Sequence, residues 1–203
     1  RDLVQSVLSS LPLSGPDLHR REACYESKSL IMVTIRLLSV DDLFKFNNVN
    51  LDAFTETFRT DFYLHYLTNW PECCVVAATP DDTIAGYIIG KVEGSNDSWH
   101  GHVTALSIAP DFRKTGLAQR LMAYLEDVCD RIHGCFFMDL FVRPSNTVAV
   151  RFYRKLGYVV WRVVSGYYSG SEDAYDMRRP LARDRDGKSI ADAHDFKTRG
   201  IKA

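Results

Sequence analysis

The order of its apolar segments predicts an α/β fold for this chain, with a mixed central sheet and helices on both faces. Seven segments have the alternating or continuously apolar pattern of strands, and four have the period of helices. In the middle of that order, the stretch HVTALSIAPDFRKTGL joins a buried strand to an amphipathic helix through a short basic glycine loop. A loop of this kind at a helix N-terminus can hold phosphate groups.

The overall composition narrows the class of protein. The chain has 203 residues, enough for one domain with a buried core, and its 46% hydrophobic content is ordinary for a globular protein. A formal net charge of −1 argues against a dedicated nucleic-acid surface. Because no apolar run reaches the roughly 18 residues of a membrane span, we expect no membrane insertion.

The five cysteines form an odd set without the spacing of metal ligands. Cys73 and Cys74 open the apolar run CCVVAA, where neighbouring side chains of a strand point to opposite faces. Buried free thiols explain the set better than a vicinal disulfide or a zinc ligand pair, so we expect no metal. Unpaired thiols favour a reducing compartment, and we expect a cytoplasmic protein. The other three are Cys24, Cys129 and Cys135.

The chain divides into three parts by its pattern. Residues 1–31 show no clean period, and we expect an N-terminal extension that is mostly unstructured, with a short docking helix as the alternative. A regular pattern begins abruptly at Met32, so the folded domain is expected to span 32–182. Residues 183–203 are polar and are expected to form a mobile C-terminal tail.

The first half of the domain has the pattern of a strand, two helices and a hairpin. Thr34–Leu38 alternates like a strand, and Ser39 is placed to cap a helix over 41–48. After a loop, a second helix over 61–69 ends before Pro71. Two apolar strands then flank a Pro-Asp-Asp turn, which predicts a hairpin.

The second half alternates strands with helices. After the strand in HGHVTALSIAP, a helix over 117–132 places Leu121 and Leu125 on one face. The buried strand CFFMDLFVR follows, and a helix over 146–156 ends at Gly157. Two further strands, YVVWRVVSGYY and the shorter EDAYDMRRPL, complete the predicted sheet.

The basic loop carries the pattern R-x-x-G-x-A, and Pro110 marks the end of the strand before it. This junction resembles the pyrophosphate loop of the GNAT family of N-acetyltransferases, which bind acetyl-CoA. The resemblance implies the GNAT acyl-CoA N-acyltransferase fold, in which two central parallel strands splay apart around this cosubstrate. It also implies that the loop contacts the CoA phosphates through Arg113, Lys114, Thr115, Gly116, Leu117 and Ala118. The alternative is a solvated turn.

A second motif, NTVAVRFYRKLGY, follows at the distance that the GNAT family has. In that family an Asn at the helix start, here Asn146, faces the pantetheine arm, and a Tyr, here Tyr153, approaches the thioester sulfur. Tyr153 is thus the candidate proton donor to the departing thiolate. A plain helix cap and a core aromatic are the alternatives for these two residues. On the strand, Leu106, Ser107 and Ile108 would align the pantetheine, and N–H groups beginning at Leu106 would hold the oxyanion.

From Met32 to about Asp184 the chain is similar, more specifically, to the catalytic subunits of NatB amino-terminal acetyltransferases. The similar segments include DLFKFNNVNLDAFTETF, FYLHYLTNWPE, EGSNDSWHGHVTALSIAP and EDAYDMRR. This resemblance implies acetylation of nascent chains that begin with Met-Asp, Met-Glu, Met-Asn or Met-Gln. It also implies a large auxiliary subunit of helical repeats, which docks the enzyme at the ribosome.

Six residues are candidates for peptide binding. His102 and Thr104 alternate along one strand and would hydrogen-bond the second side chain of the substrate. Tyr167 and Tyr168 match hairpin tyrosines that cover the peptide backbone in the NatB family; edge-strand aromatics are the alternative. Phe58 stands where that family often has Tyr, so it offers the initiator Met only apolar contact. In the same loop, Glu56 would accept a hydrogen bond from the free amino terminus or from the backbone of the peptide.

The expected chemistry is direct attack of a free α-amine on the thioester. About a tenth of an amine with a pKa near 8 is neutral at pH 7, so modest proton removal is enough. A covalent acyl-cysteine is not expected, because Cys129 and Cys135 lie in apolar settings without a partnered His. Two alternatives stay open: an acetyltransferase for another amine, and a non-catalytic module that binds CoA or a partner subunit.

Overall fold

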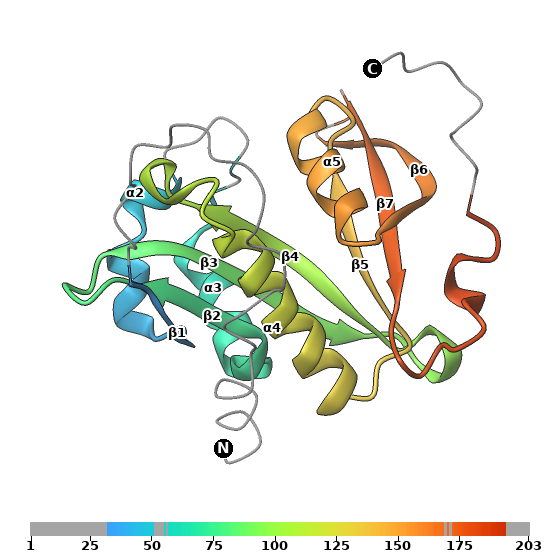
Figure 1. The fold of residues 1–203 in the computed structure, drawn as a ribbon, viewed down its shortest axis with the longest axis horizontal. Helices are drawn as coiled ribbons and strands as arrows, with labels where there is room; N and C mark the ends of the chain where they lie inside the picture. The colour runs from blue at the N-terminus through green and yellow to red at the C-terminus, as the bar shows by residue number, and fades with distance from the viewer. Residues whose placement is uncertain (1–31, 51–54, 56, 169, 171, 194–203) are drawn as a thin grey trace, which may run out of the picture.

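The computed structural model describes residues 32–50, 55, 57–168, 170 and 172–193. Within this part, seven strands form one sheet in the order β1-β2-β3-β4-β5-β7-β6 (Figure 1). β4 and β5 are parallel and the other neighbours are antiparallel, which confirms the predicted mixed sheet. The strands are β1 (Thr34–Leu37), β2 (Cys74–Ala78), β3 (Ile84–Glu93), β4 (His100–Ile108), β5 (Phe137–Val142), β6 (Val159–Tyr168) and β7 (Glu172–Pro180).

Helices cover both faces of the sheet, as predicted. α2 (Asn47–Asn50) and α3 (Thr60–Asn69) pack over a buried cluster on one face. α4 (Leu117–Arg131) and α5 (Thr147–Lys155) pack over a larger cluster on the other, and Figure 1 shows α4 lying across β3 and β4. Short 3-10 turns link these elements: η1 (Val40–Phe44), η2 (Pro71–Cys73), η3 (Asn96–Ser98), η4 (Pro110–Phe112) and η5 (Lys188–Ile190).

The cysteines at the start of β2 confirm the alternation expected there. Cys73 is buried in the cluster under α4, whereas Cys74 is buried in the cluster under α2 and α3. In the described part of the chain the cysteines are free and buried, namely Cys73, Cys74, Cys129 and Cys135. Cys24 lies outside the described residues.

The prediction of a single helix over 41–48 is wrong, because the chain forms η1, turns, and then forms α2. Asp42 holds the turn. Its carboxylate accepts from the backbone N–H and hydroxyl of Ser39, at 2.8 and 2.9 Å, and from Arg36 at 2.7 Å. Phe46 then points into the core with 3% of its surface exposed, so the backbone cannot continue as one regular helix.

A β-bulge in β4 decides which way its side chains face. Gly90 pairs with Val103 and Ile89 pairs with Ala105, so Thr104 is the extra residue on β4. A bulge reverses the alternation of the strand beyond it. Val103 accordingly packs in the cluster under α4, whereas Ala105 packs against the cluster under α2 and α3.

β4 and β5 diverge after a short parallel ladder. Their pairing stops at Val103 and Leu140, although β4 continues to Ile108 and β5 continues to Val142. Beyond Val103 the backbone edge of β4 that faces β5 has no ladder partner among the described residues. This opening is the splayed strand pair that the GNAT resemblance implied.

Two glycines set the distance between α4 and the sheet. A Cβ atom at Gly90 would lie 2.7 Å from Cδ2 of Leu125, and one at Gly101 would lie 2.4 Å from Sγ of Cys129. Any larger residue at these positions would push α4 away from β3 and β4. The helix that follows the basic loop is therefore held close to the strand that precedes the loop.

The chain after β7 is partly ordered on the domain. Asp184 has 7% of its surface exposed, and its carboxylate accepts from the backbone N–H groups of Lys188 and Ser189 at 2.8 and 2.9 Å. These bonds close a turn within residues 184–189, and Arg183 donates to the carbonyl of Gly134 at 2.8 Å. Part of the segment that was expected to form a tail therefore contacts the domain. Residues 1–31 and 194–203 lie outside the described part. No helix of the described part is long and apolar enough to cross a membrane.

Candidate active site

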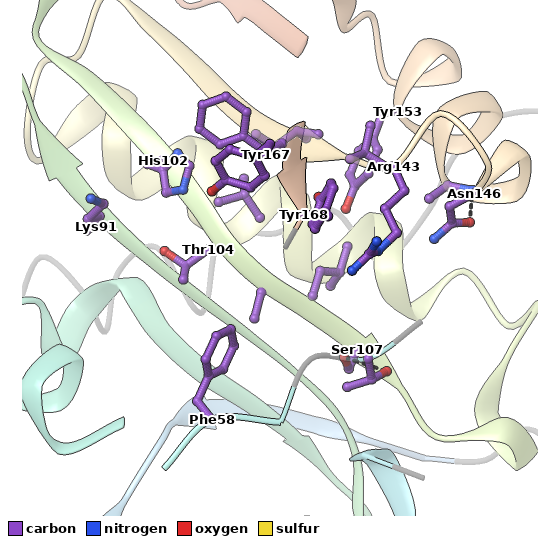
Figure 2. Close-up of a pocket in the computed structure, with 18 of the residues that line it drawn as sticks. Phe58, Lys91, His102, Thr104, Ser107, Arg143, Asn146, Tyr153, Tyr167 and Tyr168 are labelled. Atoms are coloured by element: carbon purple, nitrogen blue, oxygen red, sulfur yellow. Dashed lines mark hydrogen bonds between the residues drawn. The ribbon is translucent and has the colours of Figure 1, made fainter. Parts of the chain in front are cut away.

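A cavity of about 540 Å³ opens where β4 and β5 diverge. Its walls come from the loop before α3, from β3, β4 and β5, from the start of α5 and from the end of β6 (Figure 2). Figure 2 shows Lys91, His102 and Thr104 toward one side of the cavity, and Asn146 and Tyr153 toward the other. The cavity therefore offers two chemically different surfaces to its ligands.

His102 lines the cavity and is oriented by a buried carboxylate. Its Nδ1 lies 2.7 Å from Oδ1 of Asp139, the residue opposite it on β5, and His100 Nε2 lies 3.4 Å from Oδ2. Burial alone would raise the pKa of Asp139, but the hydrogen bonds and charges of the two imidazoles lower it well below its usual range. Asp139 is thus an ionised acceptor that keeps a proton on Nδ1 of His102 and leaves Nε2 to a ligand.

Two further polar groups lie beside His102. Thr104 donates a hydrogen bond from Oγ1 to the hydroxyl of Tyr66 at 3.1 Å. Lys91 pairs with His102 in the β3–β4 ladder, lines the same cavity, and donates from Nζ to Oε2 of Glu93 at 2.5 Å. An ammonium, an imidazole and a hydroxyl together suit carboxylate and amide groups.

Aromatic side chains form two walls of the cavity. Phe58 lines it and stacks on an aromatic residue of α3 with ring centroids 4.0 Å apart. Tyr167 stacks on Phe141 of β5 with ring centroids 4.8 Å apart, and 48% of its surface is exposed. The guanidinium carbon of Arg143 lies 3.8 Å from the ring centroid of Tyr168. Tyr167 therefore packs on β5 and Tyr168 packs on the residue that follows β5, and both tyrosines line the cavity.

Asn146 and Tyr153 bring α5 to the opposite side. Asn146 caps the helix, because its Oδ1 accepts from the N–H of Ala149 at 3.1 Å, and it also lines the cavity. Tyr153 lines the cavity about two turns further along. Burial, with a smaller contribution from Tyr168, raises the pKa of the Tyr153 phenol, so it stays protonated at neutral pH. Asn146 is therefore a helix cap that also lines the cavity. Tyr153 is an aromatic residue packed against the core, and it lines the cavity too.

The basic loop lies outside the cavity wall, since neither Ile108 nor residues 113–118 line it. Arg113 donates from Nε to the carbonyl of Ile108 at 3.1 Å, which ties the loop to the end of β4. Gly116 has a φ of 84°, in the left-handed region that suits glycine, and a Cβ there would meet nothing within 4 Å. The start of α4 has no side-chain cap among the described residues, so its N–H groups are open to an anion.

Comparison with known proteins identifies the family. Residues 42–158 match the acetyltransferase (GNAT) family. The N-alpha-acetyltransferase 20 of Dictyostelium discoideum is 55% identical and the NatB catalytic subunit of Arabidopsis thaliana 52% identical; each alignment covers 78% of this chain and 92% or 91% of the relative. The crystal structure of Chaetomium thermophilum Naa20 with a bisubstrate analogue superposes with a TM-score of 0.75 at 42% identity, covering 78% of this chain and 92% of that one.

The chain belongs to the GNAT family, among the NatB catalytic subunits. It is a peptide α-N-acetyltransferase. In this NatB catalytic subunit most of the residues singled out from sequence line one cavity, namely Phe58, His102, Thr104, Leu106, Ser107, Asn146, Tyr153, Tyr167 and Tyr168. Glu56 lies outside the described residues. The loop 113–118 and Ile108 do not line the cavity. The contact of the loop with the CoA phosphates and of Ile108 with the pantetheine therefore stay predictions.

Three residues in or beside this cavity were not predicted from the sequence: Lys91, Asp139 and Arg143. Lys91 and Asp139 flank His102 from the two neighbouring strands, and Arg143 follows β5. The available signal was a lone charge inside an apolar strand, in IIGKVEG and in FMDLF. Such a charge is rarely buried without a partner, and each of these two faces the same histidine.

Proposed function

We propose that this enzyme transfers acetyl from acetyl-CoA to the free α-amine of nascent proteins that begin with Met-Asp, Met-Glu, Met-Asn or Met-Gln. The observation that carries the proposal is the shared cavity. In it the polar side, with Lys91, His102 and Thr104, faces the side formed by Asn146 and Tyr153. A peptide terminus on the first side and a thioester on the second can meet between them.

The polar side recognises the second residue of the substrate. Lys91 attracts a carboxylate, and the Thr104 oxygen can accept from an amide N–H. Because Asp139 keeps the proton on Nδ1 of His102, Nε2 accepts from an amide when the ring is neutral and donates to a carboxylate when it is charged. One set of groups therefore accommodates both acidic and amide side chains.

The aromatic walls hold the rest of the peptide terminus. Phe58 and its stacked neighbour on α3 offer the apolar surface on which the initiator Met packs. Tyr167 and Tyr168, at the end of β6, cover the peptide backbone from the other wall. Glu56 is the proposed acceptor for the substrate amino terminus.

Asn146 and the open edge of β4 position the acetyl donor. Backbone groups of β4 beyond Val103 align the pantetheine as an added strand would, and the Asn146 amide contacts it from α5. The phosphates lie on the loop 113–118, where the uncapped start of α4 and the basic side chains favour anions. The left-handed Gly116, with open space beside it, fits a close approach of phosphate to the backbone.

The transfer proceeds by direct attack. The amine nitrogen forms the new C–N bond with the thioester carbonyl, and the N–H groups of β4 from Leu106 onward stabilise the oxyanion. The C–S bond then breaks, and Tyr153 donates a proton to the departing thiolate. The proton lost by the amine returns to Tyr153 through water. No described cysteine lines the cavity, which supports a route without an acyl-enzyme.

The surface at η1 supports a large auxiliary subunit of helical repeats, which would dock the enzyme at ribosomes in the cytoplasm. Phe44 is 77% exposed, Val40 is 49% exposed and Leu37, at the end of β1, is 41% exposed. Clustered exposed apolar side chains mark interaction sites. Phe46, two residues after Phe44, is buried and does not belong to this surface.

The proposal is tested by acetyl transfer to peptides that begin Met-Asp, Met-Leu or Ser-Ser, with the chain alone and with an auxiliary subunit. We expect strong preference for Met-Asp. Preference for another terminus, a lysine or a small amine would keep the fold and overturn the specificity. Acetyl-CoA binding without any transfer would identify a non-catalytic module instead.

A further inference from the structure

A second group of ligating side chains lies at the C-terminal end of α4. Glu72 and Cys73 belong to η2, just before β2, and His133 follows α4. One donor atom from each lies within 4.8 Å of the other two, and His133 Nε2 is 2.9 Å from Oε1 of Glu72. None of the three lines the cavity between β4 and β5, so the cluster is separate from the acetyl-transfer site.

The donor set has the chemistry of a zinc site. Thiolate sulfur, imidazole nitrogen and carboxylate oxygen are the ligands that zinc takes in proteins, at about 2.3, 2.0 and 2.1 Å. Donors held tetrahedrally at those lengths lie roughly 3.3 to 3.8 Å from one another. The three donors of the cluster are already within 4.8 Å, so side-chain adjustments alone would bring them to an ion.

Two features distinguish this cluster from a chance contact of buried residues. The ring nitrogen Nε2 of His133 is buried and makes no aligned hydrogen bond within the described chain, despite its closeness to Glu72. The backbone around the ring is fixed, because Trp99 Nε1 donates to the His133 carbonyl at 3.0 Å and His133 N–H donates to Val128 at 3.3 Å. A buried, pre-positioned nitrogen without a satisfied bond is an available metal ligand.

The neighbouring cysteine provides an internal contrast. The Cys73 thiol lies within 4.8 Å of donor atoms of Glu72 and His133, whereas Cys74 is buried in the cluster on the opposite face of the sheet. The two thiols are equally buried, yet within the described residues only Cys73 lies beside further side chains that can ligate a metal.

We propose that Cys73, His133 and Glu72 bind one zinc-type divalent ion. Binding forms a metal–sulfur bond and releases the Cys73 proton to solvent. Cys129 is a further buried thiol in the same cluster under α4. The ion would join the start of β2 to the connection between α4 and β5, so it would act as a structural staple between the two halves of the sheet.

The test uses the full chain, stripped of metal with a chelator and kept reduced. Zinc is added for stoichiometry and thermal unfolding, and cobalt for its thiolate charge-transfer absorption. We expect one ion per chain, a midpoint of unfolding several degrees higher with zinc, and a thiolate band with cobalt. Cys73→Ser and His133→Gln should each lose the band and at least tenfold in zinc affinity.

Cys74→Ser is the matched control, because it removes an equally buried thiol on the opposite face of the sheet and should keep metal binding. If Cys73→Ser fails to fold, His133→Gln and Glu72→Gln test the proposal instead, because His133 and Glu72 are partly exposed. Absence of stoichiometric zinc binding would overturn the proposal, as would equal affinity in the His133→Gln variant. Acetyl transfer is measured in parallel, and its presence or absence does not bear on the metal site.

Discussion

His102 on β4 and Asp139 on β5 face each other across the parallel strand pair, with Nδ1 and Oδ1 2.7 Å apart. They lie in the last rungs of that ladder, just before the strands diverge. The carboxylate is buried, with 5% of its surface exposed, so its bond to the imidazole is not in competition with bulk water. His102, which we propose binds the second residue of the substrate, is therefore oriented by the strand on the far side of the opening.

Replacing that carboxylate should weaken substrate recognition. In Asp139→Asn the ring of His102 loses its charged acceptor and its preferred tautomer. Because a hydrogen bond to a charged group contributes roughly 1.5 to 3 kcal/mol, we expect kcat/KM for a Met-Asp peptide to fall about tenfold or more. Steady-state kinetics with a thermal melt for each variant measures this. Asp111→Asn, on an exposed carboxylate of η4, is the control; equal kinetics in both variants would contradict the assigned role.

Removing the Tyr153 hydroxyl should affect the chemical step. Tyr153→Phe keeps the ring in place but cannot donate to the thiolate, so we expect kcat to fall about a hundredfold while acetyl-CoA affinity changes little. Single-turnover rates measure the chemical step, and calorimetry measures the affinity for acetyl-CoA. Tyr158→Phe removes a hydroxyl that bonds Glu126 at 3.0 Å outside the cavity and serves for comparison. Wild-type turnover in Tyr153→Phe would remove Tyr153 from the mechanism.

Neutralising Lys91 should change the preference among substrates. Lys91→Gln loses the ammonium beside His102, which favours carboxylates over amides at the second position. We expect the ratio of kcat/KM for Met-Asp over Met-Asn to fall about fivefold, as for a partly exposed charge pair. Lys91→Arg should keep the ratio, and high salt should shrink the difference. A ratio that is the same in Lys91→Gln and wild type would exclude Lys91 from recognition.

Acid should weaken the turn that Asp42 organises. Burial would raise the pKa of Asp42, but the bonds from Arg36 and Ser39 outweigh it and hold the pKa at about 2. An unfolded aspartate titrates near about 3.9, so this bond stabilises the fold above that pH and its contribution is lost as pH falls toward about 2.

The measurement is the free energy of unfolding in urea between pH 7 and pH 2. Asp42→Asn should be less stable than wild type at pH 7, and the difference between them should shrink as pH falls from 4 to 2. A constant difference over that range would show that the carboxylate charge does not carry the effect.

Most of the elements were predictable because they rest on local properties. The periodicity around Leu121 and Leu125, the cap at Asn146 and the glycine at 116 each depend on residues within one or two turns. The prediction of a helix over 41–48 failed because contacts with β1 and with the core decided the local structure. Arg36 on β1 binds Asp42, and Phe46 enters the core, which together outweigh the helical tendency of the segment.

The sequence by itself determined the types and order of most elements, the family, and nine of the side chains that line the cavity. Only the tertiary structure decided which residues of distant segments lie opposite one another. The bulge at Thr104, the placement of Lys91 and Asp139 on either side of His102, and the meeting of Cys73 with His133 all depend on which residues pair across strands and helices. Local backbone preferences extend over a few residues, whereas pairing between distant segments is set by burial in a common core, which no single segment encodes.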